Sequence, residues 1–115
     1  MIQRTYRVIK IGTKDELLIE FKDKKYELLS TFLDCDVANF EDWIKSDFDK
    51  VLSGEVEQKE CNGNVCCAEI NPKTTKIYDN LAEDGMGNWC EVETKELRNI
   101  IDDYCTERKK ITEKS

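Results

Sequence analysis

The sequence predicts an α+β fold, in which two main helices pack on a mostly antiparallel sheet of five to six strands. Three observations carry this prediction. Apolar side chains alternate at a period of two near the N-terminus, they recur every three to four residues in two later segments, and an Asn-Gly turn separates two further strand-like segments. With 115 residues and no linker or repeat, we expect one domain over residues 1–115.

Two strands are expected at the start of the chain. Residues 6–11 are rich in β-forming side chains, and residues 12–15 interrupt them. Leu17, Ile19 and Phe21 then alternate with their neighbours, which predicts a second strand. Residues 26–33 fit either a third strand or a short helix, so this segment stays open.

A first long helix is expected over residues 37–53. Asp36 or Asn39 could cap its start, because their side chains accept backbone N–H bonds there. Gly54 follows the end and permits the left-handed conformation that terminates helices. Asp42 and Asp49 fall opposite the apolar stripe and are expected in water. The stripe consists of Val37, Phe40, Ile44, Phe48 and Val51.

A meander and a second long helix are expected to complete the fold. Strands are predicted at residues 55–61 and 65–71 around the Asn62-Gly63-Asn64 turn, at 74–79 after Pro72, and at 89–93 after a loop. Thr94 is a plausible N-cap for a helix over residues 95–109, and residues 111–115 are expected to fray. The stripe of this helix consists of Leu97, Ile100, Ile101 and Tyr104.

Negative charge is concentrated in two blocks. Residues 34–60 carry nine acids against three bases, and residues 83–107 carry eight against two, within a net charge of −7. Such a surface repels nucleic acid and anionic membranes and attracts basic partners. No apolar run is long enough to span a membrane, and the N-terminus lacks an apolar signal region. We therefore expect a cytoplasmic protein that binds neither nucleic acid nor membrane.

The sequence offers no catalytic apparatus. It has no histidine, which excludes Cys–His and Ser–His nucleophile pairs. Cys35 lies between Asp34 and Asp36, where negative charge raises a thiol pKa, and no glycine loop could cradle a phosphate. Asp34-Cys35-Asp36 opens like a calcium loop, but the later ligand positions do not match, so helix capping is the better account. We expect a protein that is not an enzyme and uses no cofactor.

The six cysteines are expected to be reduced, buried thiols, since an intracellular chain seldom forms disulfides. A metal site is the minority hypothesis. Cys61 and Cys66 are separated by four residues, at the edge of zinc spacing, and Cys90 or Cys35 would complete the set. Cys67 points away from Cys66 if this segment is a strand, which speaks against the site.

The aromatic residues give a second indication of a partner. Tryptophan beside acidic residues is typical of a hot spot for a basic protein, because the indole supplies buried area and the acids supply steering. We favour the core for Trp43, whereas Trp89 fits the core and a binding site equally well. The candidate partner-binding residues are Asp42, Asp47, Asp49, Glu83, Asp84, Trp89, Asp102, Asp103 and Glu107.

The layout resembles small bacterial immunity proteins of polymorphic toxin systems, including contact-dependent growth inhibition. The resemblance covers residues 15–107. It rests on the segments Phe32-Leu33-Asp34-Cys35-Asp36-Val37, Val51-Leu52-Ser53-Gly54-Glu55, Gly63-Asn64, Thr75-Lys76-Ile77 and Val92-Glu93-Thr94-Lys95-Glu96-Leu97.

The resemblance implies a non-enzymatic, cytoplasmic protein that binds one cognate toxin, often a nuclease, and blocks it. The charge distribution fits this implication, because a nuclease presents positive charge to phosphates and an acidic inhibitor would compete for that groove. Two alternatives remain open: a small acidic adaptor or regulatory domain with another basic partner, and a cysteine-based metal-binding protein.

Overall fold

The computed structural model describes residues 2–63, 65–79 and 89–114. It confirms the α+β class: the six antiparallel strands in this part of the chain form two sheets. Among the described residues, strands β1 (Arg4–Ile11) and β2 (Lys14–Phe21) pair only with each other. The other four form a meander in chain order. They are β3 (Lys59–Asn62), β4 (Cys66–Ile70), β5 (Thr74–Asp79) and β6 (Trp89–Glu93).

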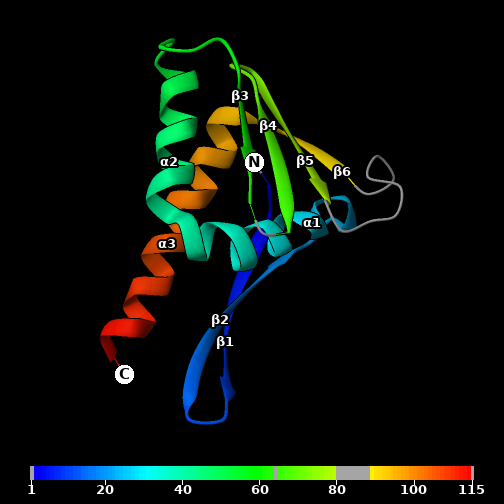
Figure 1. Ribbon diagram of the computed structural model, residues 1–115. Coiled ribbons are helices and arrows are strands. Elements are labelled where there is room, and N and C mark those ends of the chain that lie inside the picture. The colour runs from blue at the N-terminus through cyan, green and yellow to red at the C-terminus, as the bar shows by residue number, and fades with distance from the viewer. Residues whose placement is uncertain (1, 64, 80–88, 115) are drawn as a thin grey trace.

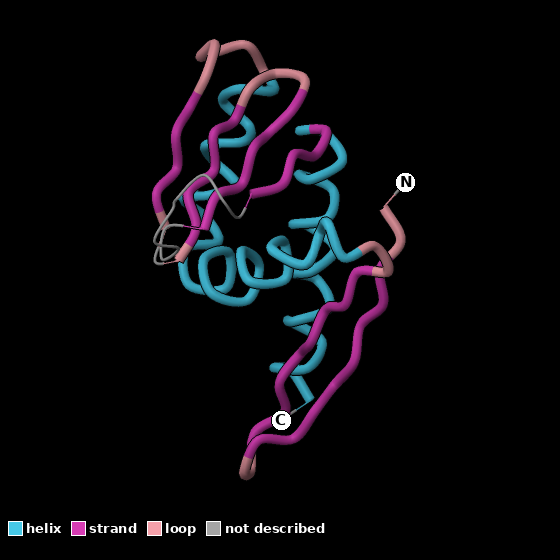
Figure 2. The backbone as a smooth tube through the Cα atoms, turned by 90° about the vertical axis from the view of Figure 1, so that its right-hand side faces the viewer, coloured by secondary structure: helices cyan, strands magenta, loops and turns pink. Residues whose placement is uncertain are grey.

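The long helices α2 (Ala38–Leu52) and α3 (Thr94–Lys114) lie next to each other on one side of the four-stranded sheet (Figure 1). The short helix α1 (Glu27–Thr31) lies between this sheet and the β1–β2 hairpin. Figure 2 shows the hairpin projecting away from the rest of the molecule, with the C-terminal end of α3 near it. The molecule therefore consists of a helix-covered sheet with a protruding two-stranded arm.

The core fills the space between the helices and the inner face of the four-stranded sheet. Alternation along β6 buries Cys90 and Val92 and exposes Trp89, as expected for a sheet covered on one face. Ile44 and Phe48 of α2 and Ile101 of α3 are fully buried opposite. Burial of each large apolar side chain in this core stabilises the fold by about 1.5–3 kcal/mol.

The β1–β2 hairpin turns at two residues, Gly12 and Thr13, and Gly12 has the positive φ of 67° that such turns require. Its register pairs Tyr6 with Ile19 and Val8 with Leu17. Leu17 and Ile19 are buried against the body, whereas the outer part of β1 is open to water. Only one face of the hairpin, near its base, contributes to the core.

The segment left open by the sequence, residues 26–33, is helical. A short 3₁₀ turn (Lys24–Tyr26) leads into α1, and a π-helical turn (Phe32–Val37) leads into α2, which is kinked near its start at Phe40. The predicted helix cap is therefore wrong, because the residue preceding α2 is helical and carries no side-chain cap. Asp36 instead accepts hydrogen bonds from the backbone N–H groups of Val65 (3.0 Å) and Cys66 (2.8 Å). Asn39 donates to the Cys35 carbonyl.

Several boundaries differ from the prediction. β3 begins only at Lys59, because the Val56 N–H donates to the Lys50 carbonyl and folds residues 55–58 against the end of α2. α3 extends to Lys114, five residues past the predicted helix end at residue 109. The Thr94 hydroxyl bonds the Asn71 carbonyl and the Thr75 hydroxyl, so it ties α3 to the β4–β5 turn. Gly54 ends α2 with a φ of 83°, as predicted.

Candidate partner-binding surface

Acidic side chains of α2 and α3 meet on the outer face of the two helices. We call this the α2–α3 face and define it by Glu41, Asp42, Lys45, Asp49, Arg98 and Asp102. Part of it is hollowed into a shallow groove of about 500 Å³ between Asp42, Asp49 and Arg98. Two further bases border the face: Lys109 Nζ lies 3.7 Å from Glu41 Oε2, and Lys50 lines the same groove. Acids from both predicted blocks therefore lie close together in the fold.

The bases of the α2–α3 face hold its acids in place. Arg98 Nε lies 2.8 Å from Asp49 Oδ1, and Arg98 Nη1 lies 2.7 Å from Asp102 Oδ1. Lys45 Nζ lies 2.8 Å from Glu41 Oε2 and 3.7 Å from Asp102 Oδ1, and its hydrogen bond lowers the pKa of Glu41. Asp42 is exposed and has no ion pair with the described residues. The face thus combines a braced acidic cluster with one freely available carboxylate.

The remaining predicted acids of α3 point elsewhere. Asp103 follows Asp102 by one residue and so turns by about 100° around the helix. It pairs with Arg4 of β1 at 2.7 Å, and Glu107 pairs with Lys110 at 3.1 Å. These two acids are oriented toward the hairpin side of α3 and do not join the α2–α3 face.

The prediction that Asp47 is a partner-binding surface residue is wrong. Its side chain is buried, with 3% exposure, because it falls on the side of α2 that faces β3. Burial, followed by the negative charge of Asp47 and its hydrogen bond, raises the pKa of the Cys61 thiol to about 12. The Oδ2 atom of Asp47 has no hydrogen-bond partner within the described residues. Asp47 is not available to a partner at the surface.

The two tryptophans lie on different surfaces. Trp89 is 48% exposed on the sheet face opposite the helices, with Lys76 Nζ 5.1 Å from the ring centroid. Trp43, which we expected in the core, is 45% exposed and packs edge-on against Phe40 with ring centroids 5.5 Å apart. Phe40 departs from helical geometry, with φ −131° and ψ 38°, at the junction with the π-helical turn. Glu83 and Asp84 lie outside the described residues.

The cysteines are unreactive by environment. Burial raises the pKa of Cys66 to about 12 and of Cys67, Cys90 and Cys105 to about 11, and it also raises the pKa of Cys35. All six thiols are free. Among the described residues, no three cysteine or carboxylate side chains are placed to hold a metal ion, so the set Cys61, Cys66 and Cys90 is not assembled. The five thiols other than Cys35, which is half-buried, act as small buried apolar side chains.

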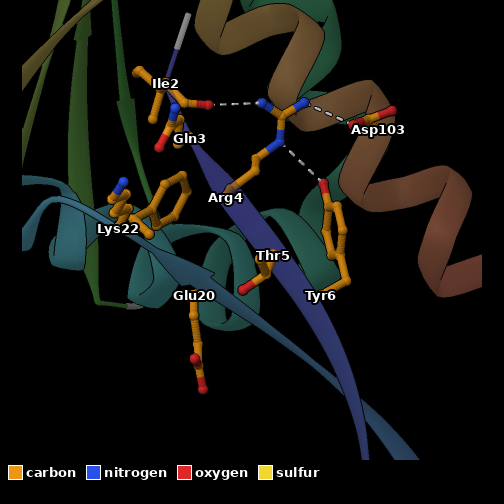
Figure 3. A pocket seen from close by; sticks show the side chains of 9 residues that line it. Ile2, Gln3, Arg4, Thr5, Tyr6, Glu20, Lys22 and Asp103 are labelled. Carbon is orange, nitrogen blue, oxygen red and sulfur yellow. Dashed lines mark hydrogen bonds and ion pairs between the residues drawn. The ribbon is translucent and has the colours of Figure 1, made fainter.

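A second hollow, of about 690 Å³, lies at the base of the hairpin (Figure 3). Arg4 lines it, and each of its three guanidinium nitrogens donates one hydrogen bond. Its guanidinium bonds Asp103 (2.7 Å), the Tyr6 hydroxyl (3.4 Å) and the Ile2 carbonyl (3.3 Å). Because the charge of Arg4 is already paired with Asp103, the hollow is better described as the place where β1 is fastened to α3 than as an anion site.

Within the described part of the chain, no helix has the length and apolar character needed to cross a membrane.

Comparison with known proteins gives one informative match. No protein-family model matches the sequence, and no solved structure does. An immunity protein of Bacillus cereus is 45% identical over 78 residues, which are 68% of this chain and 67% of that protein. The chain therefore belongs to the same family as this immunity protein.

Proposed function

We propose that the chain is an immunity protein that binds a cognate protein toxin one-to-one and neutralises it in the cytoplasm. The observation that carries this proposal is the 45% identity to a protein named for immunity. A polymorphic toxin system of the contact-dependent growth inhibition kind supplies such toxins, and the layout of the chain resembles inhibitors from those systems.

The α2–α3 face supports a basic, nuclease-type toxin as the partner. A nuclease must present positive charge to the phosphates of its substrate. Glu41, Asp42, Asp49 and Asp102 offer a matching negative surface in a protein of net charge −7. Charges arranged in this way accelerate association at low salt and disfavour partners of the wrong charge.

The proposed mechanism is occlusion and requires no chemistry from this chain. The acids of the α2–α3 face enter the substrate groove of the toxin and compete there with nucleic acid. Arg98 and Lys45 fix Asp49 and Asp102 before binding, so little side-chain entropy is lost when the complex forms. Asp42 is free to form a new ion pair with the toxin. Asp103, Glu107 and Trp89 are secondary candidates, since they lie outside this face.

The test is co-expression with the toxin domain encoded beside the gene. Wild-type protein should restore growth, and a purified one-to-one complex should show inhibited nuclease activity. The double variant Asp42→Asn/Asp49→Asn should slow association about tenfold at low salt, and this difference should shrink at high salt as charges are screened.

The matched control is Glu91→Gln/Glu93→Gln, which removes the same charge from exposed positions of β6 on the other side of the sheet. An equal effect of both double variants would show that only net charge matters. Continued cell death with the wild-type chain present would contradict the immunity function itself. Thermal melting of each variant separates loss of binding from loss of folding.

A further inference from the structure

The protruding hairpin exposes aliphatic side chains that the fold does not use. Val8 is 57% exposed and Ile11 61% exposed, and these are two of the five large apolar side chains exposed among the described residues. An isolated two-stranded hairpin is only marginally stable in water, and here only its base is buried. Figure 2 shows this arm projecting from the body of the molecule. The exposed side chains of Val8 and Ile11 give its outer half an apolar surface.

The backbone of β1 has one open edge. Within the described residues, β1 pairs only with β2. The Lys22 N–H donates to the Gln3 carbonyl, so Gln3 and Lys22 form a hydrogen-bonded pair. The next pair of the ladder, Arg4 and Phe21, is then a non-hydrogen-bonded pair. Hydrogen-bonded and non-hydrogen-bonded pairs alternate along an antiparallel ladder. Tyr6, Val8 and Lys10 therefore also belong to non-hydrogen-bonded pairs, and their N–H and C=O groups point away from β2. These peptide groups are available to another strand.

The opposite edge of the hairpin is partly covered. By the same alternation, the Ile19 carbonyl of β2 points away from β1, and it accepts a hydrogen bond of 3.0 Å from the Ser30 hydroxyl of α1. The edges of the four-stranded sheet are shorter than β1: β3 has four residues and β6 has five, against eight in β1. β1 is thus the longest free edge in the described structure.

Charge determines which strand the edge of β1 can accept. β1 carries Arg4, Arg7 and Lys10 and no acidic residue. Arg4 is paired with Asp103 and Arg7 with Glu20, whereas Lys10 is exposed and has no ion pair with the described residues. A second copy of β1 would bring like charges together across the new pair, which is unfavourable, and lysine is a common guard against such self-pairing. A strand with acidic side chains meets no such penalty.

We propose that the edge of β1 binds an extended segment of the toxin that carries acidic side chains, which adds a third strand to the hairpin. Main-chain hydrogen bonds to Tyr6, Val8 and Lys10 supply affinity, and Lys10 pairs with the acids of the added strand. This inference rests on the proposed function for its partner. It uses a surface separate from the α2–α3 face, so the two can be tested separately.

The test compares two substitutions at one position. Val8→Pro removes an outward N–H and leaves the β1–β2 hydrogen bonds in place, which edge strands tolerate. Val8→Thr keeps the N–H and the β-branched shape but loses apolar surface. With the catalytically inactivated toxin domain encoded beside the gene, we expect Val8→Pro to raise Kd at least about tenfold and Val8→Thr to change it less than about threefold. Lys10→Glu should raise Kd about tenfold.

Amide hydrogen exchange of the wild-type complex gives a readout that needs no variant. Binding should slow exchange at Tyr6, Val8 and Lys10, while Thr5, Arg7 and Ile9 are already protected by β2. Unchanged exchange at the first three positions, or wild-type affinity in a folded Val8→Pro variant, would overturn the inference and leave the immunity function standing. A concentration-dependent dimer abolished by Val8→Pro would assign the edge to a second copy instead. Absence of binding by the wild-type chain would overturn both proposals.

Discussion

The carboxylate of Asp36 lies so close to the backbone of Gly63 that no larger residue fits between them. A Cβ placed on Gly63 would stand 2.4 Å from Asp36 Cγ and 2.6 Å from Oδ1. Asp36 cannot move away freely, because it accepts hydrogen bonds from Val65 and Cys66. This contact joins the π-helical turn to the β3–β4 connection, 27 residues further along the chain.

Gly63→Ala should therefore destabilise the fold by about 1–3 kcal/mol, through overpacking against a held carboxylate. Gly54→Ala is the matched control. Its Cβ would meet nothing within 4 Å, so only the positive φ of 83° is penalised, at about 1 kcal/mol. Urea denaturation measures both. If both variants lost the same unfolding free energy, crowding against Asp36 would add no destabilisation, and the inference from the close approach would be wrong.

Substitution of the buried acids Asp36 and Asp47 by asparagine should have different effects on stability. Asp36→Asn replaces one acceptor by an N–H₂ group facing backbone N–H donors, which should cost about 1–3 kcal/mol of unfolding free energy. Asp47→Asn removes a buried charge whose Oδ2 has no hydrogen-bond partner in the described structure, and it should leave stability unchanged or raise it by about 1 kcal/mol. A large loss in Asp47→Asn would indicate a structural ion pair or hydrogen bond to that oxygen.

The buried thiols should make the protein sensitive to alkali. The pKa of Cys61 and Cys66 rises to about 12, and that of Cys67, Cys90 and Cys105 to about 11, from an ordinary value near 9. Above pH 9 the unfolded chain loses these protons before the folded chain does, so the folded state binds more protons. The contribution of these thiols to stability should therefore be constant below pH 9 and should be lost between pH 9 and about 12. Melting temperature against pH measures this.

Lysine and tyrosine side chains also titrate in that range, so the control is a thiol-deficient chain. Cys90→Ala should be less stable at pH 7 because it leaves a small cavity, but its loss of stability from pH 9 to 11 should be smaller than that of the wild type. Native protein at pH 7.5 should react slowly with a thiol reagent, and rapidly only after unfolding. Rapid reaction of the native thiols would contradict the environment described for them.

Arg4 should fasten the hairpin to the body. Arg4→Met keeps the aliphatic stem but loses the contacts to Asp103, the Tyr6 hydroxyl and the Ile2 carbonyl, so we expect a loss of about 1–2 kcal/mol and faster amide exchange in β1. Arg7→Met is the control. It breaks an exposed ion pair with Glu20 inside the hairpin and should cost less than about 0.5 kcal/mol. Similar exchange rates in both variants would contradict a fastening role for Arg4.

The regular elements could be predicted because each buries one periodic set of side chains. Phe48 and Ile44 place α2, and Val92 and Cys90 place β6, through spacing alone. The division into two sheets could not be predicted, because strand-like sequences do not encode which strands pair across the π-helical turn. The helical state of residues 26–33 was equally hidden, since a short apolar run fits both structures.

The candidate site was predictable only in part. Asp42, Asp49 and Asp102 could be placed on exposed helix faces, but their meeting around Arg98 depends on how α2 packs against α3. Asp47 was misplaced because it lies at the edge of the apolar stripe, where a small rotation of the helix decides burial. For the same reason the sequence pattern wrongly predicted a core position for Trp43, which is exposed. The open edge of β1 could not be predicted either, because no local sequence pattern shows that none of the described strands pairs with it besides β2.

The π-helical turn restricts how sequences of this family can vary in length. Two acids of this turn, two residues apart, have separate partners. Asp34 accepts a hydrogen bond of 2.7 Å from the Tyr104 hydroxyl of α3, and Asp36 accepts one from the backbone N–H of Cys66 in β4. Deleting one residue there would rotate everything that follows by about 100° and separate both carboxylates from their partners. Insertions and deletions among relatives should therefore fall outside residues 32–37, and the hairpin tip at Gly12 and Thr13 is a position where the fold can absorb them.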